Sequence, residues 1–142
     1  MTIAAVLGHK GREVATVEPG ASLQAAAAEL ARRRIGALLV MEGGQIAGIL
    51  SERDIIGCLA AHGADLTHRM VGDAMTADVI TVEPSLPVLA ALALITRRRV
   101  RHLPVVDGGA LVGIVSIGDL VKFRMERIEA EADAMRAYIQ NC

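Results

Sequence analysis

The spacing of apolar and polar positions changes along the chain, and the changes mark short strands and longer helices. Residues 14–17 are β-prone, and the Ala- and Leu-rich stretch that follows has strong helix propensity as far as Arg34. Two apolar stretches come next, at 37–41 and 45–50, and the short connection between them contains two glycines. Such a connection predicts a β-hairpin.

The same order of elements occurs twice. Residues 14–56 align with residues 79–121 without a gap, and nearly half of the aligned positions are identical. The second copy therefore predicts a strand at 79–82 and a hairpin whose strands are 103–106 and 110–115. The fold class expected from this duplication is α/β, built from two tandem β-α-β-β-α units.

Each copy also predicts two helices that begin at a serine. Because a serine oxygen can accept a backbone N–H at a helix start, we expect four serine N-caps, namely Ser22, Ser51, Ser85 and Ser116. The second helix of the first copy should stop near Gly63. Its counterpart should continue as a long charged, amphipathic helix toward Tyr138.

Composition narrows the class of protein. Hydrophobic residues make up 53% of the 142 residues, yet no uninterrupted apolar run approaches the roughly 18 residues that indicate a membrane span. The first residues lack a basic segment followed by a long apolar stretch, so no signal peptide is expected. The two cysteines, Cys58 and Cys142, form no disulfide framework. We therefore expect a soluble cytoplasmic protein.

Charge and aromatic content argue against nucleic acid as a partner. The chain has 15 Lys and Arg against 16 Asp and Glu, which gives none of the broad positive field of phosphate-backbone binders. Phe123 and Tyr138 are its only aromatic residues besides histidine, so no platform for stacked bases is expected. The four histidines lack metal-ligand spacing, and no metal site is expected.

Three sequence features, in this order and duplicated, resemble the CBS domain pair, or Bateman module. They are Val-Gly-Asp-Ala-Met-Thr at 71–76, Val-Arg-His-Leu-Pro-Val-Val at 100–106, and Gly-Ile-x-Ser-x-x-Asp at 48–54 and 113–119. The resemblance covers roughly residues 4–124. It implies a pseudo-twofold pair with a short lead-in helix, in three parts: repeat 1 with that helix (1–66), repeat 2 (67–124) and a C-terminal helical extension (125–142).

The Ser-x-x-Asp motif has two interpretations. In the first, the serine accepts a backbone N–H while the aspartate reaches back to the serine N–H, which is an acidic capping box. In the second, a ligand approaches the small Gly-Ile segment, its phosphate meets the free N–H groups of the helix start, and the carboxylate accepts the ribose hydroxyls. The resemblance implies the second interpretation, with Asp119 on the ribose, Ser116 near the sugar or phosphate, and Ile114 against the base.

The resemblance also implies that residues of both copies line each cleft, and that Arg101 and His102 lie beside the helix start, where they could meet phosphate. Gly36 and Ala37 replace that pair in the first copy and could form the floor for adenine. The main site is then expected to comprise Ala15, Gly36, Ala37, Arg101, His102, Ile114, Ser116 and Asp119. A second, weaker site is expected to comprise Ile80, Ile49, Ser51, Arg53 and Asp54.

The function expected from the resemblance is sensing, by reversible binding of an adenine nucleotide, with AMP as the first candidate and ADP, ATP, NAD or S-adenosylmethionine as others. The alternative is a ligand-free dimerisation or scaffolding module. Ser116, His102 and Asp119 supply the residue types of a hydrolase triad, but no strained nucleophile turn is indicated, so no enzyme activity is expected. The apolar side of the predicted C-terminal helix favours a homodimer, and the regulated protein would be bound in trans.

Overall fold

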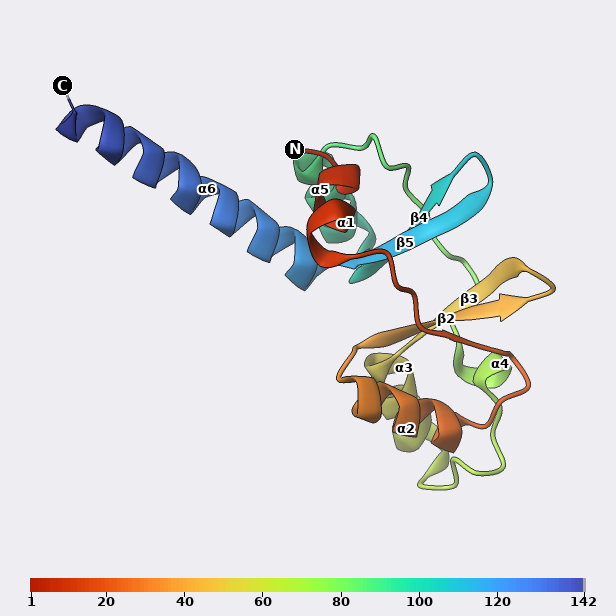
Figure 1. The fold of residues 1–142 in the computed structure, drawn as a ribbon. Helices are drawn as coiled ribbons and strands as arrows, with labels where there is room; N and C mark the ends of the chain where they lie inside the picture. The colour runs from red at the N-terminus through yellow and green to blue at the C-terminus, as the bar shows by residue number, and fades with distance from the viewer. Residues whose placement is uncertain (142) are drawn as a thin grey trace. The chain divides into compact units, whose positions relative to one another are not determined.

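The computed structural model describes residues 1–141, so Cys142 and any interpretation of it lie outside the described residues. It forms two compact units (Figure 1). The first-repeat unit is Glu13–Ile80, and the second-repeat unit combines Met1–Arg12 with the chain from Thr81 onward. In chain order the elements are α1 (Ile3–Lys10), β1 (Thr16–Val17), α2 (Leu23–Arg33), β2 (Ala37–Glu42), β3 (Gln45–Ser51), α3 (Glu52–His62), α4 (Val71–Ala74), α5 (Val88–Arg98), β4 (His102–Asp107), β5 (Ala110–Ser116) and α6 (Ile117–Gln140).

The first-repeat unit is a small sheet covered by helices. β1 pairs in parallel with β2, and β2 pairs antiparallel with β3 through the predicted hairpin at Gly43 and Gly44. Both glycines have positive φ, a conformation that costs glycine little. The core lies between this sheet and α2, α3 and α4. It comprises Leu23, Ala26, Leu30, Leu38, Val40, Leu50, Ile55 and Val71.

The second-repeat unit repeats the antiparallel hairpin, with β4 paired to β5, and covers it with α1, α5 and α6. β5 runs directly into α6, which has 24 residues and ends at Gln140. Beyond Arg124, every described residue of α6 except Ala132 is exposed (Figure 1). The predicted α/β class, the duplication and the long C-terminal helix are therefore confirmed.

Two predictions about the start of the second repeat are wrong. Residues 79–82 form no regular strand, since Val82 makes a single bridge to Val105. The N-cap of α5 is Pro87 rather than Ser85, and its side chain makes no capping bond. The N-terminal segment supplies an acceptor for the start of α5 instead. Val88 donates its N–H to the Met1 carbonyl at 3.1 Å. Ser22 caps α2 as predicted.

The segment that precedes each repeat packs on the other repeat's unit. α1 packs on β5 and α6, and its first N–H groups donate to the carbonyls of Leu86 and Pro84. α4 packs on β3 and α3, and Val71 and Gly72 donate to Ala21 and Pro19. The compact units thus differ from the sequence division at 1–66, 67–124 and 125–142. That division follows the repeat along the chain, whereas the units follow contacts in space.

Among the described residues, no helix combines the length and apolar character that crossing a membrane requires. α6 is long enough, but it carries charged residues along its whole length. Its exposed large hydrophobic side chains are Ile117, Val121, Met125, Ile128, Met135, Tyr138 and Ile139.

Candidate functional site

Both Ser-x-x-Asp motifs form capping boxes where a strand runs into a helix. At the start of α3, Asp54 donates its N–H to Ser51 Oγ at 3.2 Å, and Ser51 donates its N–H to Asp54 Oδ2 at 2.9 Å. At the start of α6, the corresponding Asp119 and Ser116 bonds measure 3.1 and 2.9 Å. The capping interpretation is therefore correct as geometry. Since both boxes use only Oδ2, the geometry does not decide against a ligand on either carboxylate.

The structure brings together five of the predicted main-site residues within the second-repeat unit. His102 lies opposite Ser116 in the β4–β5 ladder, and Pro104 lies opposite Ile114. The carbonyl of Arg101 accepts the Ile117 N–H at 2.9 Å, so the residue lies beside the start of α6. Arg101 is exposed and His102 is half-buried. These two residues, Ile114, Ser116 and Asp119 thus occupy one end of the hairpin.

The first-repeat unit repeats this arrangement without the Arg-His pair. Ala37 lies opposite Ser51 in the β2–β3 ladder, and the Gly36 carbonyl accepts the Glu52 N–H at 3.0 Å. Ile49 forms two backbone hydrogen bonds, both 2.9 Å, with Thr76 after α4. Arg53 is exposed on α3.

The remaining predicted residues lie in the first-repeat unit. The Ala15 carbonyl accepts the Leu39 N–H at 3.0 Å, so this carbonyl takes part in the sheet. Ile80 is the last residue of the unit and is half-buried. All five members of the predicted second site fall within this one unit. The predicted main site draws on both units, and that combination stays a prediction.

Lys10, at the end of α1, contacts the Asp119 carboxylate and was not predicted as a site residue. Its Nζ lies 2.9 Å from Asp119 Oδ2 and 2.6 Å from the carbonyl oxygen of Ile114. The side chains of Lys10 and Asp119 are 27% and 30% exposed, so the pair is only partly screened by water. The sequence gives Lys10 only as part of a polar stretch after an apolar helix, and nothing in it indicates a partner over a hundred residues away.

The environment of Asp119 favours its charged form. Burial, the largest single influence, raises the pKa of the carboxyl, but the hydrogen bonds from Lys10 and from the Ser116 N–H outweigh it. The pKa therefore lies below its ordinary value of 3.8. Because the pKa is lower in the folded state, Asp119 stabilises the fold at any pH above its ordinary pKa. This contribution is lost as the pH falls through the lowered pKa.

The Asp54 carboxylate meets a neutral partner instead. Its Oδ1 lies 3.5 Å from the Thr76 hydroxyl, and its Oδ2 also accepts the Ser51 hydroxyl at 3.1 Å. The two boxes therefore have the same backbone geometry and different charge surroundings. That the two motifs form ligand sites of unequal affinity stays a prediction, and Lys10 adds a charge difference to that of Arg101 and His102.

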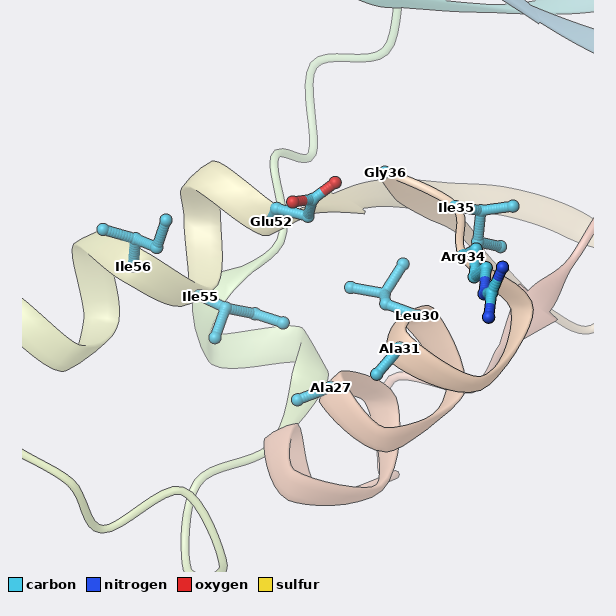
Figure 2. Close-up of a pocket in the computed structure, with 9 residues that line it drawn as sticks. All are labelled: Ala27, Leu30, Ala31, Arg34, Ile35, Gly36, Glu52, Ile55 and Ile56. Atoms are coloured by element: carbon cyan, nitrogen blue, oxygen red, sulfur yellow. The ribbon is translucent and has the colours of Figure 1, made fainter.

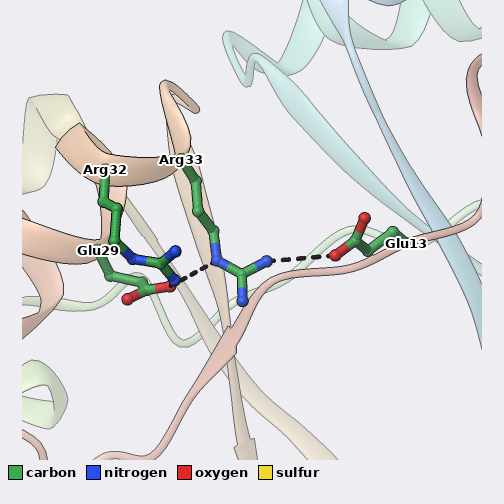
Figure 3. A network of polar contacts seen from close by, with 4 residues as sticks. All are labelled: Glu13, Glu29, Arg32 and Arg33. Atoms are coloured by element: carbon green, nitrogen blue, oxygen red, sulfur yellow. Dashed lines mark hydrogen bonds and ion pairs between the residues drawn. The ribbon is translucent and has the colours of Figure 1, made fainter.

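Arginine triplets at 32–34 and 97–99 occupy the C-terminal ends of α2 and α5. Arg32 and Arg33 lie in the last turn of α2 and both contact Glu29, and Arg33 also reaches Glu13 at 3.4 Å (Figure 3). The hydrogen bond from Arg33, followed by that from Arg32, holds the pKa of the half-buried Glu29 carboxyl below its ordinary value. Positive side chains in the last turn complement the partial negative charge at the C-terminal end of the helix. Arg32 and Arg33 thus pair with carboxylates of their own unit.

An apolar pocket of about 460 Å³ lies between α2 and α3 of the first-repeat unit (Figure 2). Ala27, Leu30 and Ala31 of α2 face Ile55 of α3 across it, and Glu52 and Gly36 lie at one end. Gly36 is the one predicted site residue in its lining, which also includes Arg34, Ile35 and Ile56. The pocket therefore borders the first Ser-x-x-Asp motif at Glu52, while Ser51 and Asp54 are not among its lining residues. Within residues 1–141, no three or more His, Cys, Asp and Glu side chains lie close enough together to hold a metal ion.

Comparison with known proteins gives matches along both repeats. The CBS domain family model matches residues 11–61 and 71–126. The CBS domain-containing protein CBSX3, mitochondrial, of Arabidopsis thaliana is 37% identical over 116 residues, which are 78% of this chain and 56% of that protein. The chain thus spans little more than half the length of this relative.

Solved structures share the fold. The CBS-domain containing protein ATU1752 from Agrobacterium tumefaciens is 38% identical, with a TM-score of 0.85 over 87% of this chain and 99% of that one. The CBS domain pair of protein MJ0100, in complex with 5′-methylthioadenosine and S-adenosyl-L-methionine, is 25% identical. Its TM-score is 0.77, and the match covers 87% of this chain and 98% of that one. With the family model matched twice and the capping boxes in equivalent places, the chain belongs to the CBS domain family, as a tandem pair of CBS domains.

Proposed function

We propose that the chain is a regulatory module that binds an adenine nucleotide reversibly, with AMP as the preferred ligand. The observation that carries this proposal is the Asp119 carboxylate, held at a helix start beside Ile114 and a basic side chain. A carboxylate in this place can accept ribose hydroxyls, and the flanking N–H groups and cations suit phosphate. The adenosine compounds bound by the related MJ0100 pair support the same ligand class.

We assign the site residues the roles that the resemblance to CBS domain pairs implies. In the proposed main site Asp119 accepts ribose hydroxyls, Ile114 packs against the base, and Arg101 and His102 face phosphate. Gly36, Ala37 and Ala15 complete the adenine contact from the other repeat. Ile49, Ser51, Arg53, Asp54 and Ile80 form the second, weaker site. No bond is broken, because ligand occupancy acts by changing how the module packs against a partner protein.

Hydrolysis is a poorer proposal for the same residues. A triad needs a serine oxygen activated by a base and an aspartate that orients the base. Here Ser116 Oγ accepts the Asp119 N–H, and the Asp119 carboxylate is taken by the Ser116 N–H and by Lys10. Asp119 thus serves as the N-cap partner of Ser116 and as the ion-pair partner of Lys10, which is not the role of an aspartate that orients a catalytic base.

The binding proposal is tested by thermal unfolding in the presence of AMP, ADP, ATP, NAD and S-adenosylmethionine. A ligand at 100 times its dissociation constant should stabilise the fold by about 2.7 kcal/mol. Guanosine and cytidine monophosphates serve as controls, because they carry the same phosphate and ribose with another base. If no adenosine compound raises the melting temperature, the module is a ligand-free scaffold, which the satisfied capping boxes also permit.

We propose further that the chain forms a homodimer through α6. Met125, Ile128, Met135 and Ile139 are exposed on this helix, with Ile139 65% accessible, although side chains of this size usually lose water on folding. Light scattering at micromolar concentration should give twice the chain mass of 14.9 kDa. Deleting residues 129–142 should weaken the dimer and leave nucleotide affinity unchanged, since no proposed ligand group lies there. A full-length species of 14.9 kDa would contradict the dimer.

A further inference from the structure

Lys10 occupies the carboxylate to which the proposed function assigns the ribose. Its Nζ makes one hydrogen bond to Asp119 Oδ2 and another to the Ile114 carbonyl, at 2.9 and 2.6 Å. Both partners belong to the proposed main site, and both the lysine and the carboxylate remain partly open to water. A ribose that approaches Asp119 therefore meets an ammonium group already bound there.

The neighbouring residue fixes the end of α1 in place. His9 Nε2 lies 3.2 Å from a Glu126 carboxylate oxygen, and its ring contacts the edge of Phe123 with centroids 5.9 Å apart. Both partners lie on α6, so the backbone next to Lys10 is held against the helix that carries Asp119. The lysine side chain itself has a flexible four-carbon stem. Its ammonium can consequently change partner without any movement of α1.

The first-repeat unit offers a built-in comparison. α1 and α4 are equivalent in backbone bonding, since Ala4 and Gly72 donate to Pro84 and Pro19, which correspond in the repeat. Counting along the two segments from these bonds makes Asp78 the counterpart of Lys10 in sequence, although α4 ends at Ala74 while α1 continues to Lys10.

The charge next to the two motif carboxylates therefore differs. Asp54 has the Thr76 hydroxyl at 3.5 Å, whereas Asp119 has the Lys10 ammonium at 2.9 Å. A neutral hydroxyl gives way to ribose hydroxyls at little electrostatic cost, because one neutral donor replaces another. An ammonium does not, since hydrogen bonds between two charged groups are roughly twice as strong as neutral ones.

We propose that Lys10 makes the Asp119 site selective for phosphorylated adenine nucleosides over adenosine itself. This inference rests on the proposed function. In the empty site the ammonium neutralises Asp119. When a nucleotide binds, its ribose hydroxyls take the carboxylate, and the phosphate supplies a new anionic partner for the displaced ammonium. Adenosine supplies no such anion, so its ribose competes with the ammonium for the carboxylate without compensation and adenosine binds more weakly.

The test is calorimetric titration of AMP and adenosine into the wild-type protein, Lys10→Met, Lys10→Arg and the control Arg127→Met. Arg127 is exposed on α6 and its nearest carboxylate oxygen, on Glu131, is 4.0 Å away, so the control removes one positive charge far from the motif. Lys10→Met should weaken AMP binding about tenfold and leave adenosine binding unchanged or stronger. Lys10→Arg and Arg127→Met should keep the preference for AMP.

The outcomes distinguish failure of the selectivity proposal from failure of the proposed nucleotide binding. If the wild-type protein binds AMP and Lys10→Met leaves the ratio of AMP to adenosine affinity unchanged, Lys10 has no role in selectivity and the proposed function stands. Equal weakening of both ligands would make Lys10 a structural residue only. If the wild-type protein binds neither ligand, both proposals fail. Should Lys10→Met unfold, Lys10→Gln removes the charge while keeping a hydrogen-bond donor, and the same loss of selectivity is expected.

Discussion

Asp119→Ala should weaken AMP binding at least tenfold, about 1.4 kcal/mol, and should leave the fold intact. The substitution removes the acceptor that we assign to the ribose hydroxyls. It also removes one half of the capping box of α6 and the partner of Lys10. Loss of a cap alone costs about 1 kcal/mol of stability. Affinity by calorimetry and stability by urea unfolding must therefore both be measured.

Asp54→Ala is the matched control for this experiment. It removes the same half of the equivalent box at the start of α3, where no lysine is present. Both variants lose a cap of nearly the same geometry, and Asp119→Ala should lose more stability because it also leaves Lys10 without its carboxylate. Only Asp119→Ala should lose most of the affinity for AMP. If AMP binds Asp119→Ala as tightly as the wild type while stability falls, the carboxylate serves as a cap and not as a ligand group.

Gly48→Ala should destabilise the fold by about 2 kcal/mol, clearly more than Gly113→Ala. A Cβ on Gly48 would lie 2.8 Å from the Thr76 carbonyl oxygen and 2.7 Å from Met75 Sδ. That carbonyl is held by the Ile49 N–H, so relief requires movement of backbone. A Cβ on Gly113 would meet the Leu7 side chain alone, at 2.7 Å.

The two glycines form a matched pair, because they occupy the same position in the two repeats and both lie in hairpin strands. The Leu7 side chain can rotate, although it is buried, so Gly113→Ala should cost about 1 kcal/mol. Urea unfolding of both variants gives the comparison. Equal losses of unfolding free energy would mean that the backbone carbonyl of Thr76 constrains Gly48 no more tightly than the Leu7 side chain constrains Gly113.

The duplication made most of the fold predictable. The hairpins, the helix starts at Ser22, Ser51 and Ser116, and the helix end at Gly63 all follow from local signals, namely alternation, capping residues and glycine. The prediction that Ser85 caps α5 was wrong because a serine near a helix start is a plausible local cap, and the local sequence does not show the distant segment that replaces it. The segment that satisfies the helix start comes from Met1 instead, far away in sequence.

The site was predictable to the extent that its residues lie within one repeat. Arg101, Ser116 and Asp119 come together because β4, β5 and α6 are consecutive in the chain. Lys10 was not predictable in this way. Its contact with Asp119 depends on α1 packing on the second-repeat unit, and neither the periodicity of α1 nor any motif around Lys10 specifies that partner.

The packing of α1 on the second-repeat unit has a consequence for folding during synthesis. All elements of the first-repeat unit lie within one continuous segment, so it can fold as soon as Ile80 has left the ribosome. Among the described elements, α1 emerges before the first-repeat unit, yet its partners β5 and α6 emerge only after that unit. An isolated eight-residue helix is marginal in water, so we expect this segment to stay unfolded until then. Lys10 and Asp119 therefore meet only in the closing step, because the most distant contacts form at the highest loop-closure cost.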